Sequence, residues 1–373
     1  MMSPAELAAT KTRISEARQA LASGHSAASD YRGLIDGLVG GLGGDAGWGG
    51  QGCALVALGG YGRGELAPRS DIDLLFLVGR HGRGQPPVES VLYPLWDLGF
   101  DVGHAVRTPA ECAELAREDL TAATALLDSR LLLGETGLLA DARSRCGIRP
   151  GGSRETRRWV SRIIDEVSGR REKFGEISHL LEPHVKEGKG GLRDFQASRW
   201  LLECAGGAPD SVPALPRGAE AAEAYEFLFR VRNALHAVAA RKTDHLTFDF
   251  HRDVAAFLFP DDPIEKFFEA VHAAGHRISA FWDETVDASR ESPGPSLPWR
   301  RRPAEPTDEE LARELDQWGR AGGDVTPLTR RALARLGAED APRVLTRLAG
   351  RLLHARSPLA PLLHELHRLG TLG

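Results

Sequence analysis

The sequence predicts an α+β fold, in which a small mixed sheet is followed by a mainly α-helical domain. Two short apolar runs rich in β-forming residues, at positions 53–58 and 72–78, bracket a glycine-rich connection and predict strand, loop and strand. Amphipathic helical patterns precede this stretch and fill most of the chain after it. With 373 residues, the chain is long enough for two or three domains.

The first 45 residues are expected to form helices. Ser3, Pro4 and Glu6 are typical of a helix start, and apolar residues follow at helical spacing. A second helix is expected over positions 27–42, with Tyr31 and Ile35 on its apolar side. The glycine-rich segment at positions 40–50 predicts a flexible lead into the first strand.

Two acids, Asp71 and Asp73, lie at the start of the second strand. Because side chains alternate along a strand, both carboxylates point to the same face, about 6.5 Å apart. Two anions beside apolar residues repel each other, and burying them without a counter-charge is unfavourable. Mg²⁺ binds one or two carboxylates together with phosphate oxygens and water, so such an ion would offset the repulsion.

A glycine turn precedes the acids. Gly59 and Gly60 end the first strand where backbone N–H groups can approach a phosphate, and Ser70 adds a hydroxyl group. Either motif alone would be an ordinary turn or loop. Together, in this order between two strands, they resemble the signature of the polymerase-β-like nucleotidyltransferase superfamily. The resemblance implies that the acids bind metal ions carrying a nucleoside triphosphate, whose phosphates the glycine turn holds.

A third acid follows after the second strand. Positions 88–98 have helical spacing, and their apolar residues are expected to pack on the sheet: Val91, Leu92, Leu95 and Trp96. Phe100 and Val102 then indicate a short strand with Asp101 between them, which resembles the superfamily's third carboxylate, a ligand of the second metal ion. The alternative is a surface acid at a strand edge. Positions 109–133 are predicted to be helices rich in Ala and Leu.

A basic turn begins the later helical region. Lys186, Lys189 and Arg193 surround a Gly-Gly pair, and a helical pattern starts at Leu192. A basic turn at a helix N-terminus favours anion binding, because free N–H groups and the helix dipole add to the side-chain charge. A charged loop that only caps the helix would have a similar sequence.

Three blocks of the sequence together resemble one family. They are GGYGRGELAPRSDIDLLFL, WDLGFDVGHAVRT and EPHVKEGKGGLRD, and in this order they closely resemble the bacterial PII-protein uridylyltransferase/uridylyl-removing enzymes. The resemblance implies transfer of UMP from UTP to a tyrosine of the PII nitrogen-regulatory protein, with Mg²⁺ or Mn²⁺. Some relatives use ATP instead. Another acceptor, or a non-catalytic nucleotide-binding regulator, remains an alternative.

The resemblance also implies roles for individual residues and limits for the domains. It assigns metal binding and catalysis to Asp71, Asp73 and Asp101, and nucleotide binding to Gly59, Gly60, Arg63, Ser70, Lys186, Lys189 and Arg193. A nucleotidyltransferase domain is expected over positions 46–150. A helical linker domain is expected over 151–290, with a core stripe of Leu228, Val231, Leu235 and Val238. A Pro-rich linker at 291–308 and short helices at 309–373 follow.

Full-length members of that family continue into an HD phosphohydrolase domain and two ligand-sensing ACT domains. None of the 13 histidines in this chain is followed by Asp, so neither removal of the nucleotide nor glutamine sensing is expected of it. A natural short form and a fragment are both compatible with this pattern.

Composition narrows the class of protein. A formal net charge of -5 argues against general nucleic-acid binding, which depends on clustered Lys and Arg. The four cysteines are scattered without a Cys-x-x-Cys pair, and no stretch has the pattern of a signal peptide or a membrane span. We therefore expect a cytoplasmic protein with no membrane partner.

Overall fold

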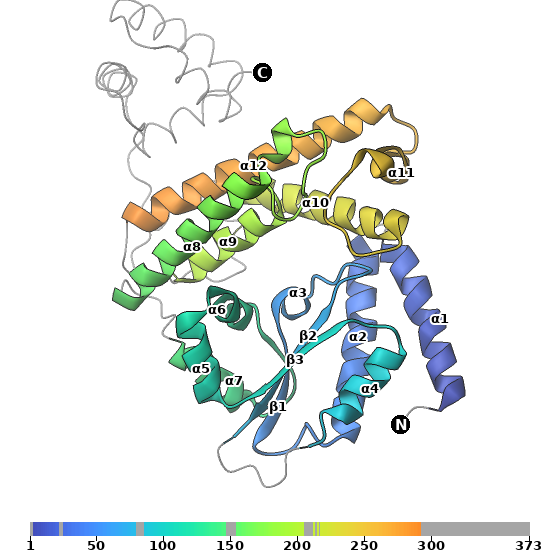
Figure 1. The fold of residues 1–373 in the computed structure, drawn as a ribbon, viewed down its shortest axis with the longest axis vertical. Helices are drawn as coiled ribbons and strands as arrows, with labels where there is room; N and C mark the ends of the chain where they lie inside the picture. The colour runs from blue at the N-terminus through green and yellow to red at the C-terminus, as the bar shows by residue number, and fades with distance from the viewer. Residues whose placement is uncertain are drawn as a thin grey trace, which may run out of the picture.

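The computed structural model describes residues 3–21, 25–79, 86–146, 154–204, 212, 215 and 217–291. It has an α+β fold, as the sequence predicts, with a sheet-containing part and a helical part (Figure 1). The predicted linker and helices beyond position 291 lie outside the described residues, and the predicted domain limits remain predictions. In the described ranges, every helix is too short or too polar to cross a lipid bilayer.

One mixed sheet of four strands organises the first part. The strands are β1 (Cys53–Ala57), β2 (Ile72–Val78), β3 (Val102–Arg107) and β4 (Arg130–Gly134), in the order β3-β2-β1-β4. β1 is antiparallel to β2 and β4, and β2 is parallel to β3. Apart from Asp73, the central strands β1 and β2 are apolar on both faces, because helices cover both faces of the sheet.

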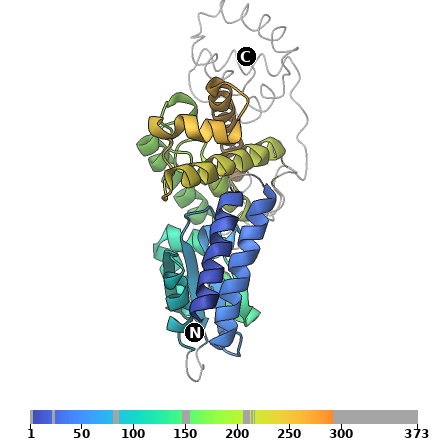
Figure 2. The same cartoon turned by 90° about the vertical axis from the view of Figure 1, so that its right-hand side faces the viewer.

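Alternate residues of the central strands enter two different cores. Leu55, Leu74 and Phe76 pack with α1 (Pro4–Leu21), α2 (His25–Asp45) and α4 (Glu89–Asp97). On the other face, Val56 and Leu75 belong to a core that includes residues of α5 (Pro109–Glu118), α6 (Leu120–Leu127) and α7 (Thr136–Arg145). α1 and α2 run side by side along one side of the sheet (Figure 2). The period of two in each strand therefore fixes which side chains meet which helix layer.

The glycine-rich segment after the second helix is not the flexible lead that the sequence predicts. α2 continues through these glycines to Asp45, and Trp48 is fully buried with its ring centroid 4.7 Å from that of Phe76. A Cβ atom on Gly43 would lie 2.8 Å from Cδ2 of Leu55. At this position glycine therefore lets the helix approach the sheet closely.

Two further expectations for this part were wrong. Trp96 does not pack on the sheet with the rest of its helix, since its exposed fraction is 45% whereas Val91 and Leu95 are buried. The end of the predicted Ala- and Leu-rich helical stretch is strand β4, which pairs with β1. A short run of leucines fits a strand as well as a helix. Here it forms a strand because β1 has an edge with which it can pair.

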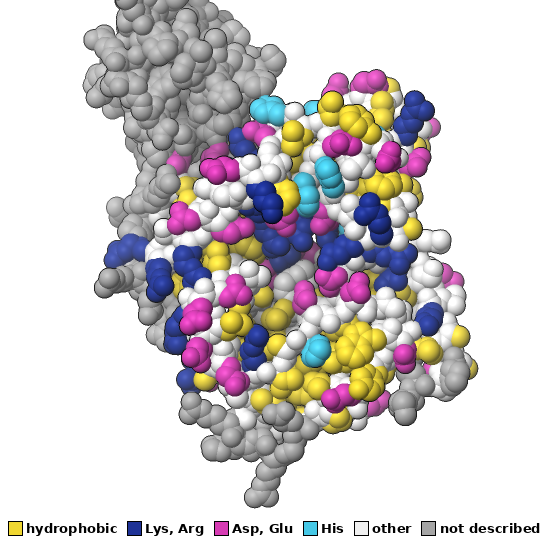
Figure 3. Space-filling view, in the orientation of Figure 1, with side chains coloured by type: hydrophobic (Ala, Val, Ile, Leu, Met, Phe, Trp, Pro, Cys, Tyr) yellow, Lys and Arg dark blue, Asp and Glu magenta, His cyan; other side chains and the backbone are white. Residues whose placement is uncertain are grey.

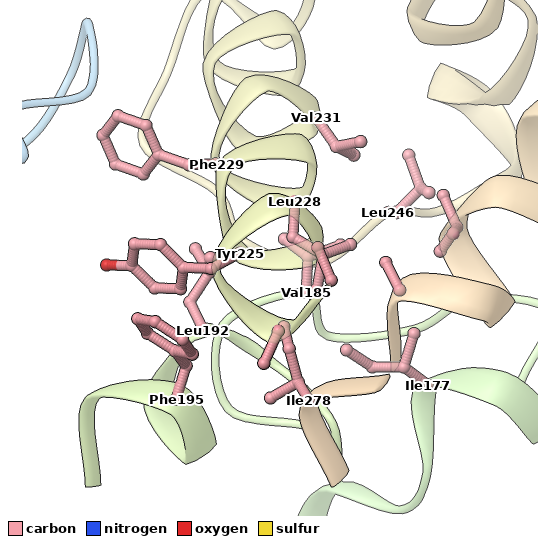
Figure 4. Close-up of a cluster of buried hydrophobic side chains, with 14 of the residues drawn as sticks. Ile177, Val185, Leu192, Phe195, Tyr225, Leu228, Phe229, Val231, Leu246 and Ile278 are labelled. Atoms are coloured by element: carbon pink, nitrogen blue, oxygen red, sulfur yellow. The ribbon is translucent and has the colours of Figure 1, made fainter. Parts of the chain in front are cut away.

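The helical part contains α8 (Arg154–Phe174), the 3₁₀ turn η1 (Ile177–His179), α9 (Leu192–Cys204), α10 (Gly218–Ala239), α11 (Phe248–Leu258) and α12 (Ile264–Glu291). Its core gathers around α10, where Leu228 lies beside Val185 (Figure 4), and the same cluster includes Val231 of α10 and Ile278 of α12. Trp200 of α9 and Trp282 of α12 belong instead to the second core of the sheet. The two parts of the chain therefore share a core, which fixes the helices relative to the strands.

Candidate functional site

The two acids predicted from the sequence lie together where β2 begins. Asp71 directly precedes the strand and Asp73 is its second residue, half-buried between the buried Ile72 and Leu74. Burial raises the pKa of Asp73, and the neighbouring charge of Asp71 raises it further, whereas Lys242 and Lys186 lower it. The acids are therefore close enough to repel each other, as the spacing in the sequence predicts.

The glycine turn lies beside the second acid. It forms the short helix α3 (Gly59–Gly62), which Gly59 enters with a positive φ of 52°. A Cβ atom on Gly59 would lie 3.6 Å from Oδ2 of Asp73. Gly60 follows, and its carbonyl oxygen accepts a hydrogen bond from the backbone N–H of Glu65 at 2.8 Å. The turn thus brings backbone that carries no side chain next to the Asp73 carboxylate.

Strand β3 places Asp101 and Gly103 next to the acids. The parallel register pairs Ile72 with Val102, and the carbonyl of Asp101 accepts a 2.9 Å hydrogen bond from the N–H of Ile72. Asp101 is thus level with Asp71, and it is exposed. Gly103 is opposite Asp73, where a Cβ atom would come within 2.4 Å of Oδ1 of Asp73. Only glycine leaves the space that this carboxylate takes up.

Basic residues of the helical part face the acids. Lys242, in the segment between α10 and α11, forms an ion pair with Asp71, with 2.5 Å between Nζ and Oδ2. Lys186 is half-buried, and its pKa is lowered by burial and then by the charges of Arg232 and Arg193. Figure 3 shows Lys and Arg side chains gathered with Asp and Glu side chains in a hollow between the part that contains the sheet and the helical part. The hollow therefore carries positive charge directly beside the carboxylate pair.

Arg232 and Lys242 were missed by the sequence analysis, which treated their segment only as a helical core stripe. Arg232 is held by Asp244, with 2.5 Å between Nε and Oδ1. Although burial acts to raise it, His236 and Arg232 hold the pKa of Asp244 well below its usual range. The signal that could have found this segment is the cluster of charged residues directly after the core stripe, Arg241-Lys242-Thr243-Asp244.

Five of the predicted nucleotide-binding residues have other partners in this structure, and one of them is Lys186, whose Nζ lies 3.7 Å from Oε1 of Glu187. Arg63 is buried between Glu65 and Asp128, with an exposed fraction of 7% for its side chain. Lys189 pairs with Glu176, with 2.6 Å between Nζ and Oε2. The remaining two have weaker contacts: Ser70 Oγ accepts a 3.1 Å hydrogen bond from the N–H of Ala67, and Arg193 lies 3.7 Å from Glu187. We therefore leave Arg63 and Lys189 out of the candidate nucleotide contacts, because strong carboxylate partners occupy both.

The donor set suits a hard divalent cation. Asp71 and Asp73 could hold Mg²⁺ or Mn²⁺, because both ions prefer oxygen ligands. Among the described residues, no group of three or more His, Cys, Asp or Glu side chains is arranged to hold a metal ion. Asp101, the third ligand that the resemblance implies, does not form such a group with Asp71 and Asp73 in this structure, and its role as a ligand stays a prediction. Asp71 and Asp73 would supply two carboxylates, and phosphate oxygens and water would complete the coordination.

Comparison with known proteins identifies relatives of this chain. Residues 158–286 match the family model described as GlnD PII-uridylyltransferase. A bifunctional uridylyltransferase/uridylyl-removing enzyme of Erythrobacter litoralis is 42% identical over 216 residues, which are 54% of this chain and 23% of that protein. The enzyme of the same description from Pseudomonas putida strain F1 is 35% identical over 327 residues, 79% of this chain and 36% of that protein.

The relatives are longer than this chain. A third relative of the same description, from Ruegeria pomeroyi, is 39% identical over 218 residues, which are 56% of this chain and 24% of that protein. The chain thus spans between about a quarter and about a third of the length of these relatives. The residues matched by the family model include the basic side of the hollow, Lys186 to Lys242, and not the two acids. This chain is therefore similar to the PII-uridylyltransferase family over residues 158–286, and to the bifunctional uridylyltransferase/uridylyl-removing enzymes over up to 79% of its length.

Proposed function

We propose that the chain is a nucleotidyltransferase that moves UMP from UTP to a tyrosine hydroxyl of a PII signalling protein and releases pyrophosphate. One observation supports this above the others: the half-buried Asp73 lies between Gly59 and Gly103, and Lys186 and Lys242 are close enough to lower its pKa. A carboxylate pair beside a glycine turn and a basic hollow matches the needs of a metal-bound triphosphate. The description of the matched family model supplies the acceptor, and the names of the relatives supply the base of the donor.

Each part of the site has a role in this proposal. Asp71 and Asp73 hold Mg²⁺ or Mn²⁺, which supplies charge neutralisation for the triphosphate. The backbone at Gly59 and Gly60 approaches the phosphates without steric hindrance from a side chain. Lys186, with Arg193 and Arg232, adds positive charge around the phosphates. The enzyme would thus act mainly by positioning and by charge stabilisation.

The proposed reaction is an in-line displacement at the α-phosphorus of UTP. The tyrosine oxygen forms a bond to this phosphorus, and the bond from phosphorus to the bridging oxygen of the β-phosphate breaks. The phenolic proton must leave as the new bond forms, because an unperturbed tyrosine has a pKa of about 10. Asp101 is our candidate for the group that accepts it, since it is exposed at the start of β3 and level with Asp71.

The test is transfer of radiolabelled nucleotide onto purified PII protein, from UTP and from ATP in parallel, with Mg²⁺ or Mn²⁺. Label from UTP alone supports the proposal, and label from ATP alone would change the donor. Binding of triphosphate without transfer from either would favour another acceptor or a regulatory protein.

Asp73→Asn should remove transfer and keep the far-ultraviolet circular dichroism of the wild type. Full activity of this variant would refute the metal assignment. Asp141→Asn is the matched control, because Asp141 lies at an exposed ion pair with Arg145 on α7.

A further inference from the structure

The ion pair between Lys242 and Asp71 differs from the other contacts at the site in its exposure. The side chains of Lys242 and Asp71 have exposed fractions of 46% and 37%. By contrast, the pair of Arg232 with Asp244, in the same region, has exposed fractions of 9% and 10%. An exposed ion pair between flexible side chains contributes little to stability, so Lys242 can exchange its partner at low cost, whereas Arg232 is fixed.

The backbone that carries Lys242 is anchored on both sides. α10 ends at Ala240, which has a positive φ of 53° and so turns the chain sharply out of the helix. Asp244, two residues after Lys242, binds Arg232 through its side chain, and its carbonyl oxygen accepts a 2.9 Å hydrogen bond from the N–H of Val185. The backbone around Lys242 is therefore fixed, and it holds the flexible side chain of Lys242 beside the acids.

A divalent cation and the ammonium group of Lys242 compete for the same oxygens. Asp71 and Asp73 repel each other, and Lys242 supplies the positive charge that offsets this repulsion when no metal ion is bound. A cation bound to both carboxylates would repel the ammonium group. The phosphates that arrive with the cation would meet Lys186 in the same hollow, and they offer Lys242 new anionic partners.

We propose that Lys242 is an exchangeable counter-charge: it pairs with Asp71 while the acids hold no metal ion and moves to the phosphates of the donor nucleotide once the metal ion is bound. This inference rests on the proposed nucleotidyltransferase function and adds a positioning residue from the helical part to it. Through Lys242, binding of a metal ion to the two acids thereby changes which group the segment between α10 and α11 contacts: Asp71 without the metal ion, and the phosphates with it.

The proposal predicts effects of opposite sign in one variant. Lys242→Gln removes the competitor for Asp71, so Mn²⁺ alone should bind about two- to fivefold more tightly, the range expected for loss of an exposed ion pair. The same variant loses a charged contact to phosphate, so a nucleotide with Mn²⁺ should bind about tenfold more weakly. A lysine that only stabilises the fold would not strengthen one affinity and weaken the other.

The experiment measures both affinities on the full chain. Binding of Mn²⁺ alone is followed by the loss of the electron paramagnetic resonance signal of free Mn²⁺. Binding of the α,β-methylene analogue of UTP, which cannot transfer UMP, is followed by calorimetry at saturating Mn²⁺. Lys266→Gln is the matched control, because Lys266 of α12 forms an ion pair with Asp262 at similar exposure. The exposed fractions of these two side chains are 58% and 38%.

Opposite shifts in Lys242→Gln, with wild-type values in Lys266→Gln and in the charge-preserving Lys242→Arg, would support the proposal. Unchanged Mn²⁺ affinity, or weaker binding of both probes, in Lys242→Gln would overturn it while leaving the proposed function intact. A wild-type chain that binds neither Mn²⁺ nor the analogue would refute the proposed function as well.

Discussion

Asp194 is the residue whose replacement should cost the most stability next to the site. It is fully buried near the start of α9, directly after the basic turn at positions 186–193. Oδ1 accepts a 2.6 Å hydrogen bond from Arg170, and Oδ2 accepts hydrogen bonds of 2.9 Å from Arg171 and 2.8 Å from the N–H of Gly190. One carboxylate thus joins α8 to the turn that carries Lys186.

Asp194→Asn keeps the size of the side chain and removes its charge. Arg170 and Arg171 would then lie largely buried without their main counter-charge, and removing one partner of a buried ion pair costs about 3–5 kcal/mol. Glu187 lies 3.6 Å from Arg170, and Asp283 lies 3.6 Å from Arg171, so partial compensation places the cost near about 3 kcal/mol.

Thermal unfolding followed by circular dichroism measures this cost. A loss of about 3 kcal/mol corresponds to a fall in Tm of about 6–12 °C, because 1 kcal/mol shifts Tm by about 2–4 °C in a domain of 150–250 residues. Asp141→Asn, which opens only an exposed ion pair on α7, should shift Tm by less than about 2 °C. If Asp194→Asn shifted Tm no more than this control, the reasoning about the buried network would be refuted.

Two further predictions concern stability. Burial lowers the pKa of His236, which is fully buried. Below pH about 6.5 the unfolded chain therefore takes up a proton that the folded chain excludes. The free energy of unfolding then falls as the pH falls, by at most about 1.4 kcal/mol per pH unit for this residue. Urea unfolding from pH 7 to 5 should show a shallower pH slope for His236→Gln than for the wild type; equal slopes would contradict the assignment. Gly43→Ala should destabilise the fold by about 1–3 kcal/mol, because the added Cβ would lie 2.8 Å from the fully buried Leu55. Gly40→Ala should stabilise the fold by about 0.5–1 kcal/mol, because no neighbouring atom lies within 4 Å of the added Cβ and alanine favours the helix. Urea unfolding separates the two variants, and stabilisation by both would show that helix propensity, rather than close packing, governs α2.

The sequence predicted the local parts of the site because each depends on near neighbours. The apolar runs of β1 and β2, the Gly-Gly turn and the two acids are all visible at short spacing, and the period of two in a strand correctly placed Asp71 and Asp73 together. The core stripe predicted for α10 was also correct, since Leu228, Val231 and Leu235 are fully buried and Val238 is partly buried against the same core. The position of Asp101 at the start of β3 followed from the same pattern.

The structure corrected the sequence where a side chain had several possible neighbours. Composition could not distinguish a flexible glycine-rich segment from a helix that packs tightly, and the contact of Gly43 with Leu55 decided it. Arg63 lies beside the glycine turn in sequence, yet Glu65 and Asp128 bind its guanidinium group. In each position the residue type allowed both interpretations, and the packing selected one.

The sequence alone determined which residues can carry the chemistry: two carboxylates after a glycine turn, and a basic turn at a helix start. Only the tertiary structure decided which charges meet. Asp71 pairs with Lys242 across 171 positions of the chain, and the shared core of Trp200 and Trp282 holds the helices against the sheet. Periodicity records the local environment of a residue, whereas electrostatic pairing depends on distance through space, which only the packing of helices on strands sets.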